Sequence, residues 1–335
     1  MRYFHILFLA FIFFQISTAQ SQTRPANQVV IDPSDTTKKE TPSSVPAGNT
    51  QASAPRNYNN LIKSHAITRR GLFTVHKVDD KYYFEIPDSL LGRDILVVCR
   101  IAQGAAGIRP EHTGYAGDQV GNTVIRFEKG PDSKLFLRRI TFEEHPGDSS
   151  DAMFHAVVRS NLQPLVSAFG IGAYSPNGRG SVIEITDYIN GDNDVFFFSS
   201  QAKKTMRVGG LLSNMSYIKD VNSFPMNVEM RTIKTYRNTA TSNTFTLELN
   251  TSLVLLPKVP MRKRFADRRI GYFTERYTDY DANPQGVKVV SYIKRWRLEP
   301  RPEDMAKYLR GELVEPQKPI IYYIDPATPK KWPGR

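Results

Sequence analysis

The pattern of apolar and polar positions predicts a chain built mainly from short β-strands. Around Phe245, apolar residues alternate with polar ones, because Phe245, Leu247 and Leu249 are separated by Thr246 and Glu248. A period of two is typical of a strand with one buried and one solvated face. Similar runs recur between short turns. The predicted strands are 72–78, 82–86, 93–103, 122–130, 134–144, 152–160, 181–189, 194–200, 223–237 and 244–256.

Short turns between these runs favour antiparallel neighbours. Asp79-Asp80 is expected to join 72–78 and 82–86 in a hairpin, and Gly130-Pro131-Asp132 separates the next such pair. Residues 161–169 and 185–189 could form short helices in place of strand. The predicted fold class is a β-rich α+β protein with mostly antiparallel sheets and few short helices.

The pattern changes towards the C-terminus. Residues 270–277 alternate like a strand, and 287–299 predict a matching strand with Val290, Tyr292 and Trp296 on one face. Residues 301–312 carry helix signals, with Pro302 and acids at the start and Gly311 at the end. Ile320–Ile324 predict one further apolar strand.

The N-terminal segment predicts export. Residues 1–19 combine Arg2, an apolar run and a small-residue Ser17-Thr18-Ala19 end, which is typical of a cleavable signal peptide. We therefore expect a periplasmic or extracellular protein without a membrane span after cleavage. Residues 20–57 are rich in Ser, Thr, Pro and Gln and predict a disordered linker. Three parts should follow, a small N-terminal domain (58–103), a main β-rich accessory domain (104–300) and a helix-strand connector (301–335).

Charge adds one candidate surface. The chain carries 45 Lys and Arg against 33 Asp and Glu, and six of its cations lie between Met261 and Arg276 among aromatic residues. That mixture suits nucleic acid, but export argues against it, and a solvated or domain-facing basic ridge is the ordinary interpretation. Asp267 could pair with Arg264 or Arg268. The candidate interface residues are Arg264, Asp267, Arg268, Arg269, Tyr272, Phe273 and Trp296.

No catalytic, cofactor-binding or metal-ligating residue is predicted. The single cysteine, Cys99, lies in an apolar run and is expected to be a buried hydrophobe. The six histidines show neither the i, i+4 pair nor the His-x-His pair of common zinc sites. There is no Gly-x-Ser-x-Gly elbow and no phosphate loop. A site assembled across strands around His112 or His145 stays open as an alternative.

Three long segments resemble one known family. They are "GLFTVHKVDDKYYFEIPDSLLGRDILVVCRIAQG", "SLVLLPKVPMRKRFADRRIGYFTERYTDY" and "YIKRWRLEPRPEDMAKYLRGELVEPQKPIIYYIDPATPKKW". Together they resemble the N-terminal part of large exported bacterial zinc-dependent metalloproteases of the zincin type. The resemblance implies two N-terminal domains of unknown function, followed by a catalytic domain with a His-Glu-x-x-His helix.

The chain departs from that family in one respect. His-Glu-x-x-His is absent, so no zinc ligand is carried over, and zinc is expected only in the missing catalytic domain. We therefore expect a non-catalytic N-terminal fragment that supports a protease domain, with an exposed apolar patch at 320–332. A free-standing exported module that binds peptide, glycan or a partner protease is the alternative. Nucleic acid is not an expected partner.

Overall fold

The computed structural model describes residues 54–106, 113–141, 144–145, 159–241, 243–279, 286, 288–324, 326 and 328–329. The predicted signal peptide, nearly all of the predicted linker and all but the last two residues of the predicted strand at 152–160 fall outside these residues. No helix in the described part is long and apolar enough to cross a membrane.

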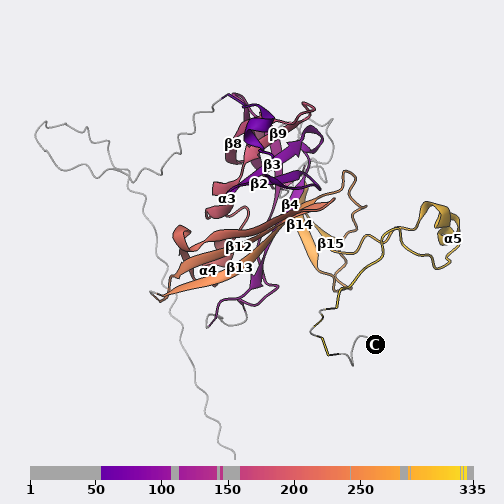
Figure 1. Ribbon diagram of the computed structural model, residues 1–335. Helices are drawn as coiled ribbons and strands as arrows, with labels where there is room; N and C mark the ends of the chain where they lie inside the picture. The colour runs from indigo at the N-terminus through magenta and orange to yellow at the C-terminus, as the bar shows by residue number, and fades with distance from the viewer. Residues whose placement is uncertain are drawn as a thin grey trace, which may run out of the picture. The chain divides into compact units, whose positions relative to one another are not determined.

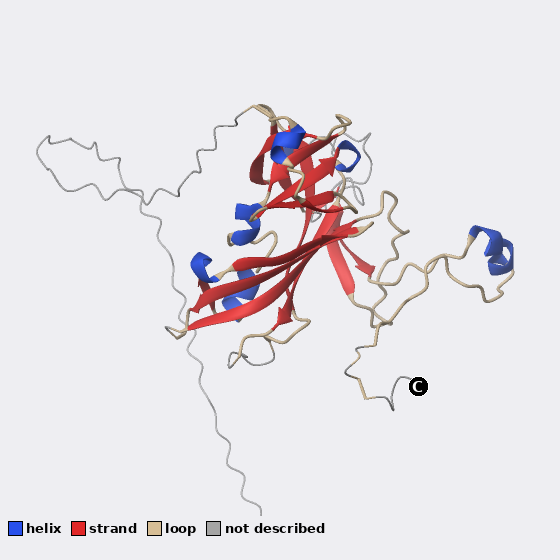
Figure 2. Ribbon diagram, viewed as in Figure 1, coloured by secondary structure: helices blue, strands red, loops and turns tan. Residues whose placement is uncertain are grey.

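Strands dominate the described chain (Figures 1 and 2), which confirms the predicted β-rich class with few short helices. Twelve strands form one sheet in the order β1-β2-β3-β9-β8-β6-β5-β4-β13-β12-β10, with β11 also paired to β12. Every pair in this sheet is antiparallel. The strands are β1 (Ile67–Arg69), β2 (Thr74–Val78), β3 (Lys81–Pro87), β4 (Ile95–Gln103), β5 (Gln119–Lys129), β6 (Lys134–Ile140), β8 (Leu165–Tyr174), β9 (Gly180–Glu184), β10 (Val208–Leu211), β11 (Tyr217–Ser223), β12 (Asn227–Asn238) and β13 (Thr244–Leu255).

The two ends of this sheet meet at a seam between β1–β2 and β11. The Leu72 amide donates to the Phe224 carbonyl at 2.6 Å, and the Ser223 hydroxyl donates to the Phe73 carbonyl at 2.6 Å. The Arg69 guanidinium reaches the Val221 carbonyl at 3.1 Å and also contacts Asp220. The sheet thus encloses one main hydrophobic core, which includes Phe73, Phe84, Phe127, Ile125 and Leu249.

The predicted hairpins are present. β2 and β3 pair from Thr74↔Glu85 to Val78↔Lys81, and Asp79 occupies the turn with a positive φ of 53°. Cys99 is buried on β4, as predicted, and burial raises the pKa of its thiol to about 12. Of the two segments with a helix alternative, 185–189 contributes to helix α3 (Thr186–Asn190), whereas most of 161–169 belongs to β8, which begins at Leu165.

The prediction of a strand at 194–200 is wrong. Phe196, Phe197 and Phe198 are all buried, whereas a strand would point alternate side chains to opposite faces. Instead, the Asn193 side chain accepts from the Phe196 amide at 2.8 Å and starts a turn. The Thr251 hydroxyl then donates to the Phe196 carbonyl at 2.6 Å, so the aromatic triplet fills the core as a loop. Helix α4 (Ser200–Thr205) follows.

A second, smaller sheet contains β15 (Lys288–Ile293), β14 (Thr274–Asp279) and β7 (Glu144–His145) in that order. The predicted strand at 270–277 therefore begins only at Thr274. Residues 267–272 turn instead, because the Ile270 amide donates to the Asp267 carbonyl at 3.0 Å and the Tyr272 amide to the Ile270 carbonyl at 3.0 Å. β15 ends before Trp296, so Trp296 does not share a strand face with Val290 and Tyr292.

The remaining helices are short and lie at the ends of the described chain or in connections. They are α1 (Tyr58–Leu61), η1 (Asp88–Leu90), η2 (Ser213–Met215), η3 (Pro302–Asp304) and α5 (Met305–Leu309). The predicted helix after Pro300 is thus present, and it ends before Gly311, whose φ is +85°. The predicted strand at Ile320–Ile324 is wrong, since within the described residues no strand pairs with it. A strand needs hydrogen-bonded neighbours, which this segment lacks there.

The predicted boundary at residue 103 does not separate two sheets. β2, β3 and β4 precede it, yet β3 pairs with β9, and β4 pairs with β5 and β13. Strands from both sides of the boundary therefore share one sheet and one core.

Candidate interaction surface

Exposed apolar side chains gather in residues 258–324, which we call the C-terminal region. Sixteen of the 25 large hydrophobic residues that are exposed in the described chain belong to it. Residues 54–256, which we call the body, hold nearly the whole buried core, and Val290 is the only buried hydrophobic residue described beyond Leu253. An apolar surface of this kind marks a site of interaction with another molecule or domain.

The β14–β15 hairpin gives this region a rigid frame. The Tyr277 and Tyr292 rings stack with centroids 5.0 Å apart, and Phe265 stacks on Tyr292 at 5.2 Å. The Lys263 ammonium lies 4.8 Å from the Tyr277 ring and 5.0 Å from the Tyr292 ring. Burial and the hydrogen bond between the two hydroxyls raise the pKa of Tyr277. The stack therefore stays neutral and fixed.

The predicted interface residues all lie on the surface of this region. Phe273 is 87% exposed and Trp296 is 64% exposed, and Tyr272 is exposed as well. The backbone links two of these segments, because the Lys294 amide donates to the Phe273 carbonyl at 2.8 Å. The described residues show no ring contact between Tyr272, Phe273 and Trp296, so these three do not form a single aromatic platform.

The predicted pairing of Asp267 with Arg264 or Arg268 is wrong. Asp267 pairs with Arg269, whose Nη2 lies 2.7 Å from its Oδ2. The Arg269 amide also donates to Asp267 Oδ1 at 3.0 Å, so the carboxylate closes a local turn that brings residue 269 back to it. This pair lowers the pKa of Asp267 and raises that of Arg269. Arg264 and Arg268 lie on the surface and do not pair with Asp267.

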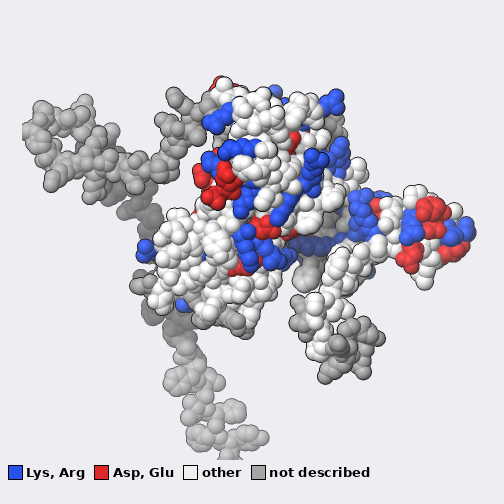
Figure 3. Space-filling view, viewed as in Figure 1, with Lys and Arg blue, Asp and Glu red and all other residues white. Residues whose placement is uncertain are grey.

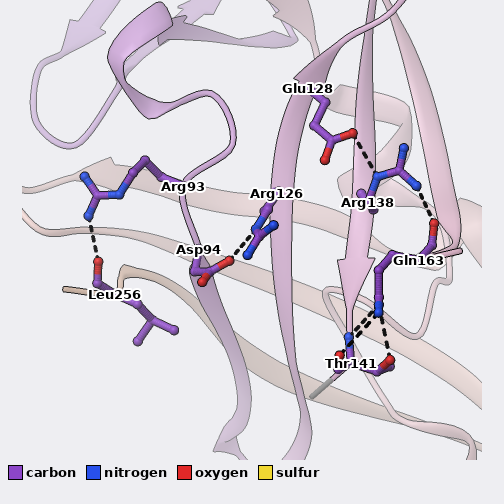
Figure 4. A network of polar contacts seen from close by, with 8 residues as sticks. All are labelled: Arg93, Asp94, Arg126, Glu128, Arg138, Thr141, Gln163 and Leu256. Atoms are coloured by element: carbon purple, nitrogen blue, oxygen red, sulfur yellow. Dashed lines mark hydrogen bonds and ion pairs between the residues drawn. The ribbon is translucent and has the colours of Figure 1, made fainter. Parts of the chain in front are cut away.

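Polar contacts in the body fix the point where the C-terminal region begins (Figure 4). Arg93 donates to the Leu256 carbonyl at 2.8 Å, and Arg126 pairs with Asp94 at 2.5 Å. Arg138 pairs with Glu128 at 2.8 Å and also reaches the Gln163 carbonyl. The chain therefore leaves the body at Leu256, which the residues just before β4 hold through its backbone.

Lys234 occupies a polar site in the core that the sequence analysis did not find. Its side chain is fully buried on β12, and its ammonium donates to the carbonyls of Ile189, Asn190 and Gly191 at 2.6, 2.8 and 2.9 Å. It also lies 4.2 Å from the Phe197 ring. Burial lowers the pKa of Lys234 to about 8. The only available signal was its register, since Lys234 falls on the same alternate positions of β12 as Val228, Met230 and Tyr236.

His76 lies in a second polar cluster, on neighbouring strands. Its Nε2 is 3.0 Å from Glu85 Oε2, and its Nδ1 is 2.9 Å from the Thr68 hydroxyl. Tyr58 of α1 donates to the same Glu85 oxygen at 2.9 Å. The hydrogen bond with His76 lowers the pKa of Glu85 to about 2. These contacts tie α1 and β1 to the sheet, because Tyr58 comes from α1 and the other groups come from the neighbouring strands β1, β2 and β3.

The described residues contain no group of three or more His, Cys, Asp and Glu side chains arranged to hold a metal ion. His112 and the side chain of His145, which the alternative site would need, fall outside them. A cleft of about 450 Å³ lies beside α4 and β5, lined by Asp118, Asn122 and Gln201 among others. Asp118 there accepts from two backbone amides, so its carboxylate holds a turn. We derive no catalytic step from this cleft.

Comparison with known proteins yields two matches of unknown function. A family model described as a domain of unknown function, DUF5117, matches residues 117–301, more than half of the chain. The chain belongs to the DUF5117 family. A second model, also described as a domain of unknown function (DUF5118), matches residues 55–104. No curated protein and no solved structure matches the chain.

The DUF5117 match runs from the loop before β5 through the β14–β15 hairpin. It therefore includes the body strands from β5 onward as well as the basic, aromatic part of the C-terminal region. The DUF5118 match ends where β4 ends. The two families therefore meet inside one sheet, and the surface described above belongs in large part to the DUF5117 segment.

Proposed function

We propose that this chain is the non-catalytic accessory part of an exported zinc-dependent metalloprotease, and that its C-terminal region holds the protease catalytic domain. One observation carries the proposal. Aliphatic and aromatic side chains of residues 305–324 are exposed, whereas the apolar side chains of the body are mostly buried. Leu313 and Tyr323 are almost fully exposed, and Leu309, Ile321, Tyr322 and Ile324 are exposed too. A protein domain of matching shape would remove these side chains from water.

The sequence resemblance supplies the kind of partner. The exposed segment Ile320–Ile324 is strongly β-forming, and it belongs to the part of the sequence that in the resembling proteases leads into the catalytic domain. In the described part of this chain it has no strand to pair with. The same domain would thus cover its apolar side chains and satisfy its backbone.

The accessory role would be support rather than chemistry. The Lys234 site and the Glu85 cluster rigidify the body through groups that are already hydrogen-bonded to one another. A rigid body that presents an apolar surface can position a second domain or assist its folding. Zinc, in this proposal, belongs to the catalytic domain and supplies the Lewis acid there.

The test combines metal content, hydrolysis and binding. The chain that lacks residues 1–19 is purified, and its zinc content and peptide hydrolysis are measured with and without a separately produced catalytic domain of a resembling protease. We expect a one-to-one complex and hydrolysis only when the catalytic domain is present. Stoichiometric zinc together with hydrolysis by the chain alone would contradict the proposal.

A second candidate function is a free-standing binding module, for which the exposed Phe273 and Trp296 are the supporting observation. Such a module would bind a peptide or glycan and ignore the catalytic domain. Binding of those ligands by the chain, with no complex in the experiment above, would favour this candidate.

A further inference from the structure

The positive charge of the chain is concentrated in one part of the C-terminal region. Residues 258–301 contain twelve Lys and Arg and five Asp and Glu, a net of +7 out of +12 for the whole chain. The other 291 residues together hold only the remaining +5. Figure 3 shows Lys and Arg atoms where Figure 1 places β14 and β15. A local excess of this size sets up a potential that selects partners by charge.

The acids of this segment are too few to neutralise its cations, and those with a described ion pair each bind one cation. Asp267 holds Arg269, Glu275 holds Lys294, and Glu299 lies 2.9 Å from Arg297. Among the described residues, no carboxylate comes within ion-pair distance of Arg264, Arg268 or Arg276, all of which are exposed. These three guanidinium groups are available to an outside anion.

The body uses its cations differently. Arg138 pairs with Glu128, Arg139 pairs with Asp194 at 2.6 Å, and Glu248 receives both Lys219 and Arg231. Arg138–Glu128 and Arg231–Glu248 join neighbouring strands, so the sheet itself neutralises part of the charge of the body. The net charge excess of residues 258–301 is a local property, because these 44 residues carry +7 and the other 291 residues carry +5.

Exposed apolar side chains decide between a protein and a nucleic acid as partner. Phe265, Phe273 and Trp296 are interleaved with the free guanidinium groups, and aromatic residues with Arg are enriched at protein interfaces. The aliphatic side chains of Leu309 and Leu313 follow along the chain and need an apolar partner surface. The rings of Tyr277 and Tyr292 stack on each other, which leaves less ring face for bases.

We propose that residues 258–301 bind an acidic face of a folded protein domain, through Arg264, Arg268 and Arg276 with Phe265 as an apolar anchor. This inference rests on the proposed function and adds the chemistry of the partner, whose carboxylates should surround an apolar centre. A guanidinium group can bind a carboxylate with two parallel hydrogen bonds. The stacked Phe265, Tyr292 and Tyr277 rings hold the anchor in place before binding, which reduces the entropy lost on association.

Association kinetics with the catalytic domain of a resembling protease test the inference. We compare the chain without residues 1–19, a triple variant (Arg264→Glu, Arg268→Glu, Arg276→Glu) and a control triple variant of the body (Arg179→Glu, Lys204→Glu, Arg237→Glu). The control changes three exposed cations and has the same net charge as the first variant. We expect the first variant, but not the control, to slow association about tenfold, and added salt to slow the unmodified chain by a similar factor.

Three outcomes separate this inference from the proposed function. If the domain binds equally to all three proteins and salt has no effect, the acidic-face inference is wrong and the accessory role stands. If the domain does not bind at all, the accessory role fails, and the charge inference is decided by a folded acidic protein as probe. If an acidic ferredoxin, used as this probe, binds the unmodified chain and the control variant but not the first variant, the acidic-face inference is supported. Equal binding to all three proteins, or no binding, would overturn the inference. Preferential binding of single-stranded DNA over that probe would also overturn it, in favour of nucleic acid.

Discussion

The body and the C-terminal region use the same kinds of residue in opposite ways. Both are rich in aromatic and basic side chains, yet in the body Phe196, Phe197 and Phe198 are buried and Lys234 donates to three carbonyls. In the C-terminal region Phe273 and Trp296 are exposed, and Arg264 and Arg268 have no carboxylate among the described residues. Composition alone therefore does not decide whether such residues stabilise the fold or form an exposed binding surface.

The largest effect should come from removing the buried ammonium. Lys234→Met leaves three buried carbonyls without their donor, and we expect it to lower the free energy of unfolding by about 3–5 kcal/mol. Lys129→Met is the control, since Lys129 forms an exposed ion pair with Asp88, and it should cost less than about 1 kcal/mol. Urea unfolding followed by circular dichroism measures both. Equal losses in the two variants would contradict a special role of Lys234.

The second largest effect should be a loss of stability of the body at low pH, caused by protonation of Glu85. Its folded pKa of about 2 lies below the ordinary value of 4.5 for a glutamate, so the unfolded state binds more protons between these two values. Stability from this group is therefore complete above about pH 4.5 and is lost as the pH falls to about 2, a loss of about 2–3 kcal/mol. Unfolding at a series of pH values should show it, and Glu85→Gln should flatten the curve in this window. An unchanged pH dependence in the variant would assign the loss to other carboxylates.

A smaller effect is expected at the seam of the large sheet. Arg69→Met removes the contacts that β1 makes with Asp220 and with the Val221 carbonyl, and we expect a loss of about 1–2 kcal/mol. Hydrogen exchange should also become faster in β1 and β11 than in β12 and β13. The neighbouring substitution Arg70→Met serves as the control because Arg70 is exposed. Uniform acceleration across the sheet would mean that the seam does not open locally.

The smallest effect on stability belongs to the C-terminal region. Ile321→Ser and Tyr323→Ser change exposed side chains, so each should alter the free energy of unfolding of the isolated chain by less than about 0.5 kcal/mol. The same pair of substitutions should weaken binding of the catalytic domain about tenfold or more. A large loss of stability with unchanged binding would reverse the comparison between the two regions.

The sequence predicted the parts whose structure depends on near neighbours. The 72–86 hairpin, the helix after Pro300 and the buried Cys99 follow from local alternation, turn residues and capping signals. Two errors arose where contacts other than the alternation of apolar and polar residues decide. The phenylalanines at 196–198 form a loop because Thr251 and Asn193 bind its backbone. Ile320–Ile324 has the composition of a strand but lacks a neighbour in the described chain.

The candidate surface was predicted more fully than its internal contacts. The seven predicted interface residues are exposed, as alternation and charge indicated, but the partner of Asp267 depended on the turn at 267–270. Lys234 could not be found from sequence, because its three acceptors are backbone carbonyls some 45 residues away, and backbone atoms leave no residue-type signal.

The site of Lys234 has a consequence for how the body responds to its surroundings. A loop whose carbonyls are held by a free metal ion loosens whenever that ion is diluted or sequestered, since occupancy follows mass action. Here the positive charge is covalently attached to β12, so its local concentration is fixed. Chelators and changes in ion supply should leave this loop ordered, even where they inactivate a metal-dependent partner.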